Sequence, residues 1–192
     1  KETSEGNALS QLREQLDEIQ ALRQNYEAEL VGTRNDREDV IDNAVFVSST
    51  SIDLKPHRKA VWDVINDLNL TFIGMEEFAP TELAPVDLIR QKVIESNVYL
   101  GILGMRYGFV DPGTGLSMTE LEYRQAIASD KRICMFVMAD NAPILANMVE
   151  DDPVRFAKLI DFRGRILKAH TCAMFTDPSD LANKAQSTLK DI

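Results

Sequence analysis

The stretch Val98-Tyr-Leu-Gly-Ile-Leu103 is a continuous apolar run. Its length suits a β-strand, and apolarity without polar alternation is typical of a strand that is covered on both faces. Similar runs are Ala44-Val-Phe-Val47, Leu70-Thr-Phe-Ile73, Ile133-Cys-Met-Phe-Val-Met138 and Cys172-Ala-Met-Phe175. Together these runs predict a sheet of five buried parallel strands.

Helical segments separate the predicted strands. The apolar residues of the first two keep the three- and four-residue spacing of one helix face, and they are Val61, Val64, Ile65, Leu68, and then Val86, Ile89 and Val93. Asp53 is placed to cap the first helix, and Pro85 suits the first turn of the second. Three further helices are predicted at about 117–129, 153–170 and 180–192.

Strand and helix thus alternate five times, which predicts an α/β domain over residues 40–192. Right-handed crossovers between parallel strands then give an open sheet with helices on both faces. We expect the flavodoxin-like strand order 2-1-3-4-5, in which ligands bind at the carboxyl ends of the first and third strands.

Composition limits the classes of partner. The chain has 192 residues, of which 44% are hydrophobic, so one domain with an appendage is expected. With 21 basic and 31 acidic residues the net charge is −10, which argues against nucleic acid or an anionic membrane as the main partner. A local basic pocket for a nucleotide stays open. The sequence contains no secretion signal and no long apolar stretch. Cys134 and Cys172 lie in apolar runs and are interpreted as core residues, so a cytoplasmic protein is expected.

Residues 1–39 have a different pattern. Leu9, Leu12, Leu16, Ile19, Tyr26 and Leu30 recur at helical spacing among Glu, Gln and Arg residues. This pattern predicts an amphipathic helix or short coiled coil, which either docks on a partner or a second copy, or serves as a solvated spacer. Because the chain opens directly in this helix, we expect a piece of a longer protein whose other domains are its partners.

Polar residues follow the strands that flank the predicted ligand crevice. Ser48, Ser49 and Thr50 end the first strand, and Arg106 and Tyr107 follow the third. Glu76 comes after the second strand. Hydroxyls, a guanidinium for phosphate and a ring for a base would together bind a nucleotide. The alternative for Arg106 and Tyr107 is an ordinary surface ion pair and a half-buried ring, and the Ser and Thr residues are also common in turns.

Glu120 is the sharpest catalytic candidate, and Glu122 is the second. A carboxylate at the start of the third helix is placed to bind a ribose diol or to stabilise the cation formed when an N-glycosidic bond breaks. The competing interpretation is a capping box, in which Ser117 and Glu120 satisfy the first helical amides and Arg124 pairs with Glu120 four residues on.

Other chemistries lack their motifs. The sequence contains no P-loop, no dinucleotide fingerprint after the first strand and no nucleophile elbow. His57 and His170 are far apart and are expected at the surface, so no metal site and no bound cofactor are predicted.

Four segments in order carry a family resemblance: Val45-Phe-Val-Ser-Ser-Thr-Ser-Ile-Asp-Leu54, Gly74-Met-Glu76, Tyr99-Leu-Gly-Ile-Leu-Gly-Met-Arg-Tyr-Gly108 and Thr119-Glu-Leu-Glu-Tyr123. The chain resembles, from about residue 43 onward, a domain-of-unknown-function family with a Toll/interleukin-1-receptor-like (TIR-like) fold. Members typically head multidomain proteins with nucleotide-binding and tetratricopeptide-repeat modules, in bacterial defence-type proteins among others.

This resemblance implies a signalling or effector domain. Catalytic TIR domains hydrolyse NAD through a glutamate near the start of the third helix, which Glu120 matches best. NAD is then a substrate rather than a cofactor. Two alternatives remain: a non-catalytic protein-interaction or oligomerisation module, and an enzyme similar to nucleoside deoxyribosyltransferases, which also break N-glycosidic bonds.

Overall fold

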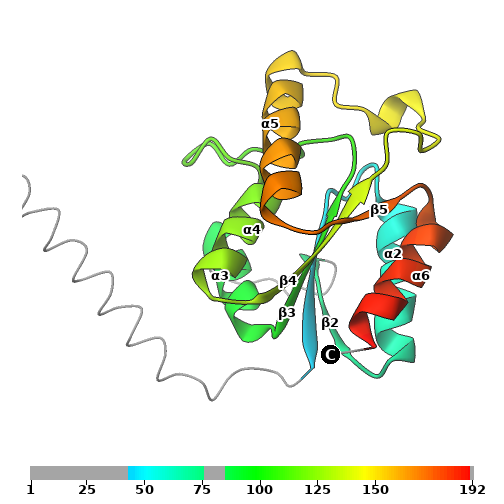
Figure 1. Ribbon diagram of the computed structural model, residues 1–192. Coiled ribbons are helices and arrows are strands. Elements are labelled where there is room, and N and C mark those ends of the chain that lie inside the picture. Colours follow the sequence, from blue (N-terminus) through cyan, green and yellow to red (C-terminus); the bar gives the residue numbers. More distant parts are fainter. Residues whose placement is uncertain (1–42, 76–84, 191–192) are drawn as a thin grey trace, which may run out of the picture. The chain divides into compact units, whose positions relative to one another are not determined.

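A computed structural model describes residues 43–75 and 85–190 of the chain. It contains a five-stranded sheet of order β2-β1-β3-β4-β5, and every pair of neighbouring strands is parallel (Figure 1). This confirms the predicted strand order. The predictions for residues 1–39 and for Glu76 fall outside the described residues.

Strands and helices follow the expected alternation. The strands are β1 (Ala44–Ser48), β2 (Thr71–Ile73), β3 (Val98–Leu103), β4 (Arg132–Met138) and β5 (Ala173–Phe175). The helices are α2 (Lys55–Asp67), α3 (Pro85–Glu95), α4 (Met118–Ala128), the 3-10 turn η3 (Ala146–Met148), α5 (Pro153–Ala169) and α6 (Pro178–Leu189). The sequence did not predict η3.

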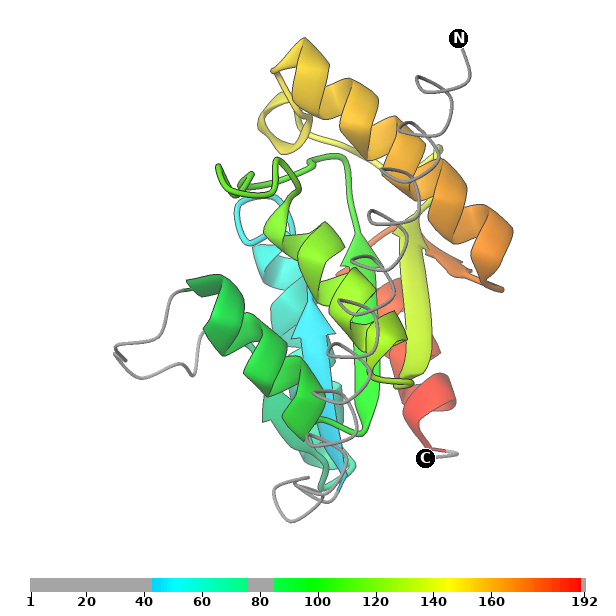
Figure 2. The same cartoon turned by 90° about the vertical axis from the view of Figure 1, so that its left-hand side faces the viewer.

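The helices form a layer on each side of the sheet. In Figure 1, α2 and α6 cover one face, while α3, α4 and α5 lie on the other, and Figure 2 shows that second layer from its own side. All residues of β1 and β3 are buried, as continuous apolar runs require when both faces are covered. Among the described residues, no helix is long and apolar enough to cross a membrane.

Two local predictions are wrong. The N-cap of α2 is Leu54 without a side-chain cap bond, because the Asp53 carboxylate turns to the Thr50 hydroxyl instead. His57 is buried, since the first turn of α2 packs its ring at 5.3 Å from the ring of Phe175 on β5. Burial lowers the pKa of His57, because the charged imidazolium would lose its hydration there.

His170, the other histidine, is partly exposed. It forms a hydrogen bond with Tyr123, at 2.8 Å between Nε2 and Oη.

Candidate functional site

The hydroxyls that end β1 are engaged within the chain. Ser48 is buried and donates a short hydrogen bond to Glu122 of α4. Thr50 donates to Asp53, and Ser49 accepts a bond of 2.9 Å from the Arg58 guanidinium. These bonds hold the loop that follows β1 against α2 and α4.

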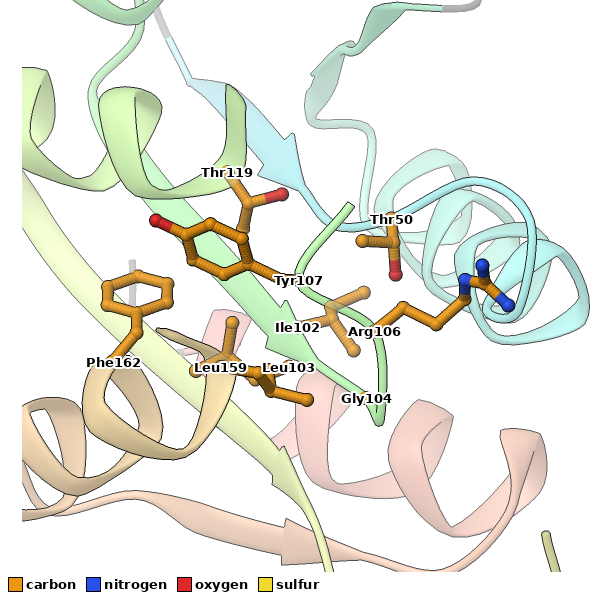
Figure 3. Close-up of a pocket in the computed structure, with 9 residues that line it drawn as sticks. All are labelled: Thr50, Ile102, Leu103, Gly104, Arg106, Tyr107, Thr119, Leu159 and Phe162. Atoms are coloured by element: carbon orange, nitrogen blue, oxygen red, sulfur yellow. The ribbon is translucent and has the colours of Figure 1, made fainter. Parts of the chain in front are cut away.

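Arg106 and Tyr107 leave the chain in opposite directions (Figure 3). The Arg106 guanidinium donates to the carbonyls of Asn147 and Val149 at 3.0 and 3.2 Å, and lies 3.8 Å from the Glu150 carboxylate. It therefore fastens the segment around η3 to the end of β3. Both residues still line one small cleft beside β3, as expected from the sequence, but their polar ends bond on different sides of it.

Tyr107 points toward α4 and α5, and its ring is buried rather than half-buried. Its hydroxyl donates to Glu120 Oε2 at 2.8 Å. Gly108 has a positive φ of 87°, and a Cβ there would lie 2.8 Å from Thr50 Cγ2. A glycine is needed for this turn to approach the loop after β1 so closely.

Glu120 is the centre of a buried network. Ser117 caps α4 by accepting the Glu120 backbone N–H at 3.2 Å, which confirms that part of the predicted cap. The Glu120 carboxylate bonds outward instead: Oε1 accepts from Arg124 at 2.7 Å, as predicted, and from Arg165 of α5 at 2.8 Å. Its side chain is only 2% exposed.

The charge of Glu120 is set by this network. Burial by itself would raise the pKa of Glu120, but the hydrogen bonds from Tyr107, Arg165 and Arg124 outweigh it and hold that pKa below its usual value. Conversely, burial and the bond to Glu120 raise the pKa of Tyr107. Near neutral pH the site therefore contains an ionised carboxylate and a protonated phenol.

Glu120 and Tyr107 line an open groove between α4 and α5, with a volume of about 640 Å³. That size falls within the range of small-molecule sites. The other lining residues are Leu116, Arg124, Pro153, Val154, Ala157, Lys158, Asp161 and Arg165. Lys158 connects α5 to the loop that precedes α4, since its ammonium donates to the Gly115 carbonyl at 2.6 Å. The same ammonium lies 6.0 Å from the Tyr107 ring centre.

The crevice predicted beside β3 is nearly closed. Figure 3 shows a small cleft that Thr50, Arg106, Tyr107 and Thr119 line together with apolar side chains from β3 and α5. The space in it that a water-sized sphere can occupy is about 0 Å³, compared with about 640 Å³ in the open groove. Arg163 of α5 helps to close this edge by donating to the carbonyls of Gly104 and Met138 at 3.1 and 2.9 Å. The open groove, not this cleft, has room for a ligand.

Glu122 lies on the inner side of α4, against the sheet. It is 3% exposed and accepts the Ser48 hydroxyl. Burial, and then the Glu122 charge, raise the pKa of Tyr99 well above its usual value. The two candidate carboxylates thus face different surroundings: Glu120 faces the groove, and Glu122 faces the end of β1.

Sequence reasoning missed Arg165 and Lys158. Both come from α5, 45 and 38 residues after Glu120 in the chain. Only the packing of α5 beside α4 brings Arg165 to the Glu120 carboxylate and Lys158 to the same groove. No local motif marks them. Among the described residues, no group of His, Cys, Asp and Glu side chains is arranged to bind a metal ion.

A family model described as Domain of unknown function (DUF4062) matches residues 44–190. The chain belongs to this family. The match covers the whole described α/β domain and leaves residues 1–43 outside DUF4062. Among curated proteins, the comparison gives no match to this DUF4062 chain.

Solved structures with similar folds come from several protein classes. The TIR domain heterodimer of RPS4 and RRS1 is 10% identical, with 77% of this chain and 95% of that chain covered and a TM-score of 0.47. The CMP N-glycosidase BcmB of Clostridium botulinum is 16% identical, with 73% and 96% covered and a TM-score of 0.42. An archaeal flavodoxin is 13% identical, with 78% and 94% covered and a TM-score of 0.38. At these identities and TM-scores the likenesses carry no argument about the chemistry of the DUF4062 chain.

Proposed function

We propose that this domain is a signalling or effector module that binds a nucleotide such as NAD in the α4/α5 groove and hydrolyses its N-glycosidic bond. One observation carries the proposal: Glu120 presents an ionised carboxylate, hydrogen-bonded by Tyr107, at the wall of a ligand-sized groove. The groove replaces the β1/β3 crevice as the place of binding, because that crevice is nearly closed.

The chemistry needs a carboxylate in its charged form. When the bond between C1′ of the ribose and the base nitrogen breaks, its electron pair leaves with the base, and C1′ and the ring oxygen share a positive charge. A carboxylate fixed nearby stabilises that charge without reorganisation. Water then adds to C1′ and releases a proton. The lowered pKa of Glu120 keeps it ionised for this role near neutral pH.

The test is release of nicotinamide from NAD, followed by chromatography at high protein concentration. We compare the unaltered chain with Glu120→Gln and Glu122→Gln, and use Glu95→Gln on α3 as a control, since Glu95 bonds Lys92 far from the groove. We expect turnover to fall at least a hundredfold in Glu120→Gln only. Far-UV circular dichroism checks that each variant stays folded.

The second candidate function is a non-catalytic interaction module, and a different observation favours it. Both oxygens of Glu120 are already bonded within the chain, by Tyr107 on one side and two arginines on the other. A structural carboxylate that joins α4 to α5 is held in the same way. This function is supported if the unaltered chain shows no turnover even when clustered on a scaffold, while Glu120→Gln lowers its unfolding midpoint. Solution mass with and without residues 1–39 then tests oligomerisation through that segment.

A further inference from the structure

The α4/α5 groove has a cationic rim that hydrolysis by Glu120 does not require. Arg124, Lys158 and Arg165 face it together with two carboxylates, Glu120 and Asp161. The sum is one positive charge in excess, in a chain whose net charge is −10. A local surplus of this sign attracts anions to a surface that otherwise repels them.

The arginines keep hydrogen-bond donors for a ligand. Arg124 uses Nε and Nη2 on Glu120, and Arg165 uses Nη2 on Glu120 and Nε on Asp161. Each guanidinium has five N–H donors, so both retain others. Their side chains are 54% and 43% exposed, whereas the Glu120 side chain is 2% exposed. A ligand in the groove therefore meets the guanidinium groups before it meets the carboxylate.

Glu120 accepts bonds from two of these three cations. The bonds of 2.7 and 2.8 Å from Arg124 and Arg165 to Oε1 hold the carboxylate in place and help to keep it ionised. An anion bridging Arg124 and Arg165 has the N–H groups that Glu120 and Asp161 leave unused. Phosphate suits this role, because its oxygens accept bidentate bonds from guanidinium groups.

We propose that the rim formed by Arg124, Lys158 and Arg165 binds the phosphate groups of a nucleotide, while Arg124 and Arg165 keep their bonds to Glu120. The inference rests on the proposed function and assigns the phosphate subsite of its substrate, so that free nucleosides are excluded. A neutral nucleoside lacks the group that these cations bind, and it is therefore not anchored in the groove.

The first experiment measures binding without catalysis. Isothermal titration at low salt compares ADP with adenosine on the unaltered chain, on Arg124→Gln/Arg165→Gln and on Lys158→Gln, which leaves the bonds of Glu120 in place. The charge-matched control is Lys59→Gln/Arg90→Gln, whose side chains lie exposed on α2 and α3. We expect ADP to bind at least tenfold more tightly than adenosine. The double variant and Lys158→Gln should each lose at least threefold of the ADP affinity, with the control unchanged.

Several results would overturn this rim as a phosphate site. They are equal affinity for ADP and adenosine, no ADP binding, or an equal loss of affinity in the control. The two proposals can be refuted separately. ADP binding without NAD turnover refutes the proposed hydrolysis and leaves the phosphate site standing. NAD turnover that is unchanged in Lys158→Gln, with no binding of ADP, refutes the phosphate site alone.

Discussion

Arg163 is the side chain whose loss should most disturb the edge of the sheet beside the site. It lies on α5, is 7% exposed, and donates from Nη1 to the Gly104 carbonyl and from Nη2 to the Met138 carbonyl. These carbonyls follow β3 and end β4. One guanidinium thus joins α5 to the carboxyl ends of two neighbouring strands.

The expected cost of Arg163→Met follows from these contacts. Methionine replaces much of the packed stem, but both carbonyls lose a charged donor. Each buried group left without its partner costs about 1–3 kcal/mol. Part is offset because a buried cation no longer has to be desolvated, and burial already lowers the pKa of Arg163. We therefore expect the free energy of unfolding to fall by about 2–4 kcal/mol.

Urea denaturation followed by far-UV circular dichroism measures this loss through the midpoint at unchanged slope. Lys168→Met is the matched control, because Lys168 lies exposed in the last turn of the same helix and should change stability by less than about 0.5 kcal/mol. If Arg163→Met is as stable as that control, the two carbonyls find other partners and Arg163 does not close the edge.

Two further predictions concern the turn after β3 and the packing of α2. Gly108→Ala should destabilise the domain by more than about 1 kcal/mol in the same urea assay, since a Cβ at φ 87° is strained and would lie 2.8 Å from Thr50; a stability equal to the unaltered chain would contradict the close approach. Because burial lowers the pKa of His57 while Asp177 only partly opposes it, the unfolded chain takes up this proton first. Stability linked to His57 is thus fully present above pH of about 6.5 and declines below it, and urea midpoints between pH 8 and 5 should decline less steeply in His57→Leu; identical slopes would show that other groups control the decline.

The strands could be predicted because a strand that is buried on both faces needs an apolar or small residue at every position. Every residue of Val98–Leu103 is buried, so each one had to be apolar or small. The start of α4 was also predictable, since the Ser117 cap and the Glu120 amide are three residues apart. Such local bonds depend on spacing alone.

The direction of a side chain depends on what packs beside it, which spacing does not record. Arg106 and Tyr107 are neighbours in the chain and line one small cleft, yet the guanidinium bonds the segment around η3 and the phenol bonds Glu120. His57 looked like a surface residue because its burial comes from β5, more than a hundred residues later.

Continuous apolar runs and cap spacing act over a few residues, and for that reason the five parallel strands and the helix that carries Glu120 could be predicted from the sequence. The packing of the folded chain was needed to show that Glu120 faces a groove with Arg165 and Lys158, while Glu122 faces Ser48 at the end of β1. The helix α5 reaches α4 through contacts between distant parts of the chain, and these contacts determine which cations surround the carboxylate and thereby its charge.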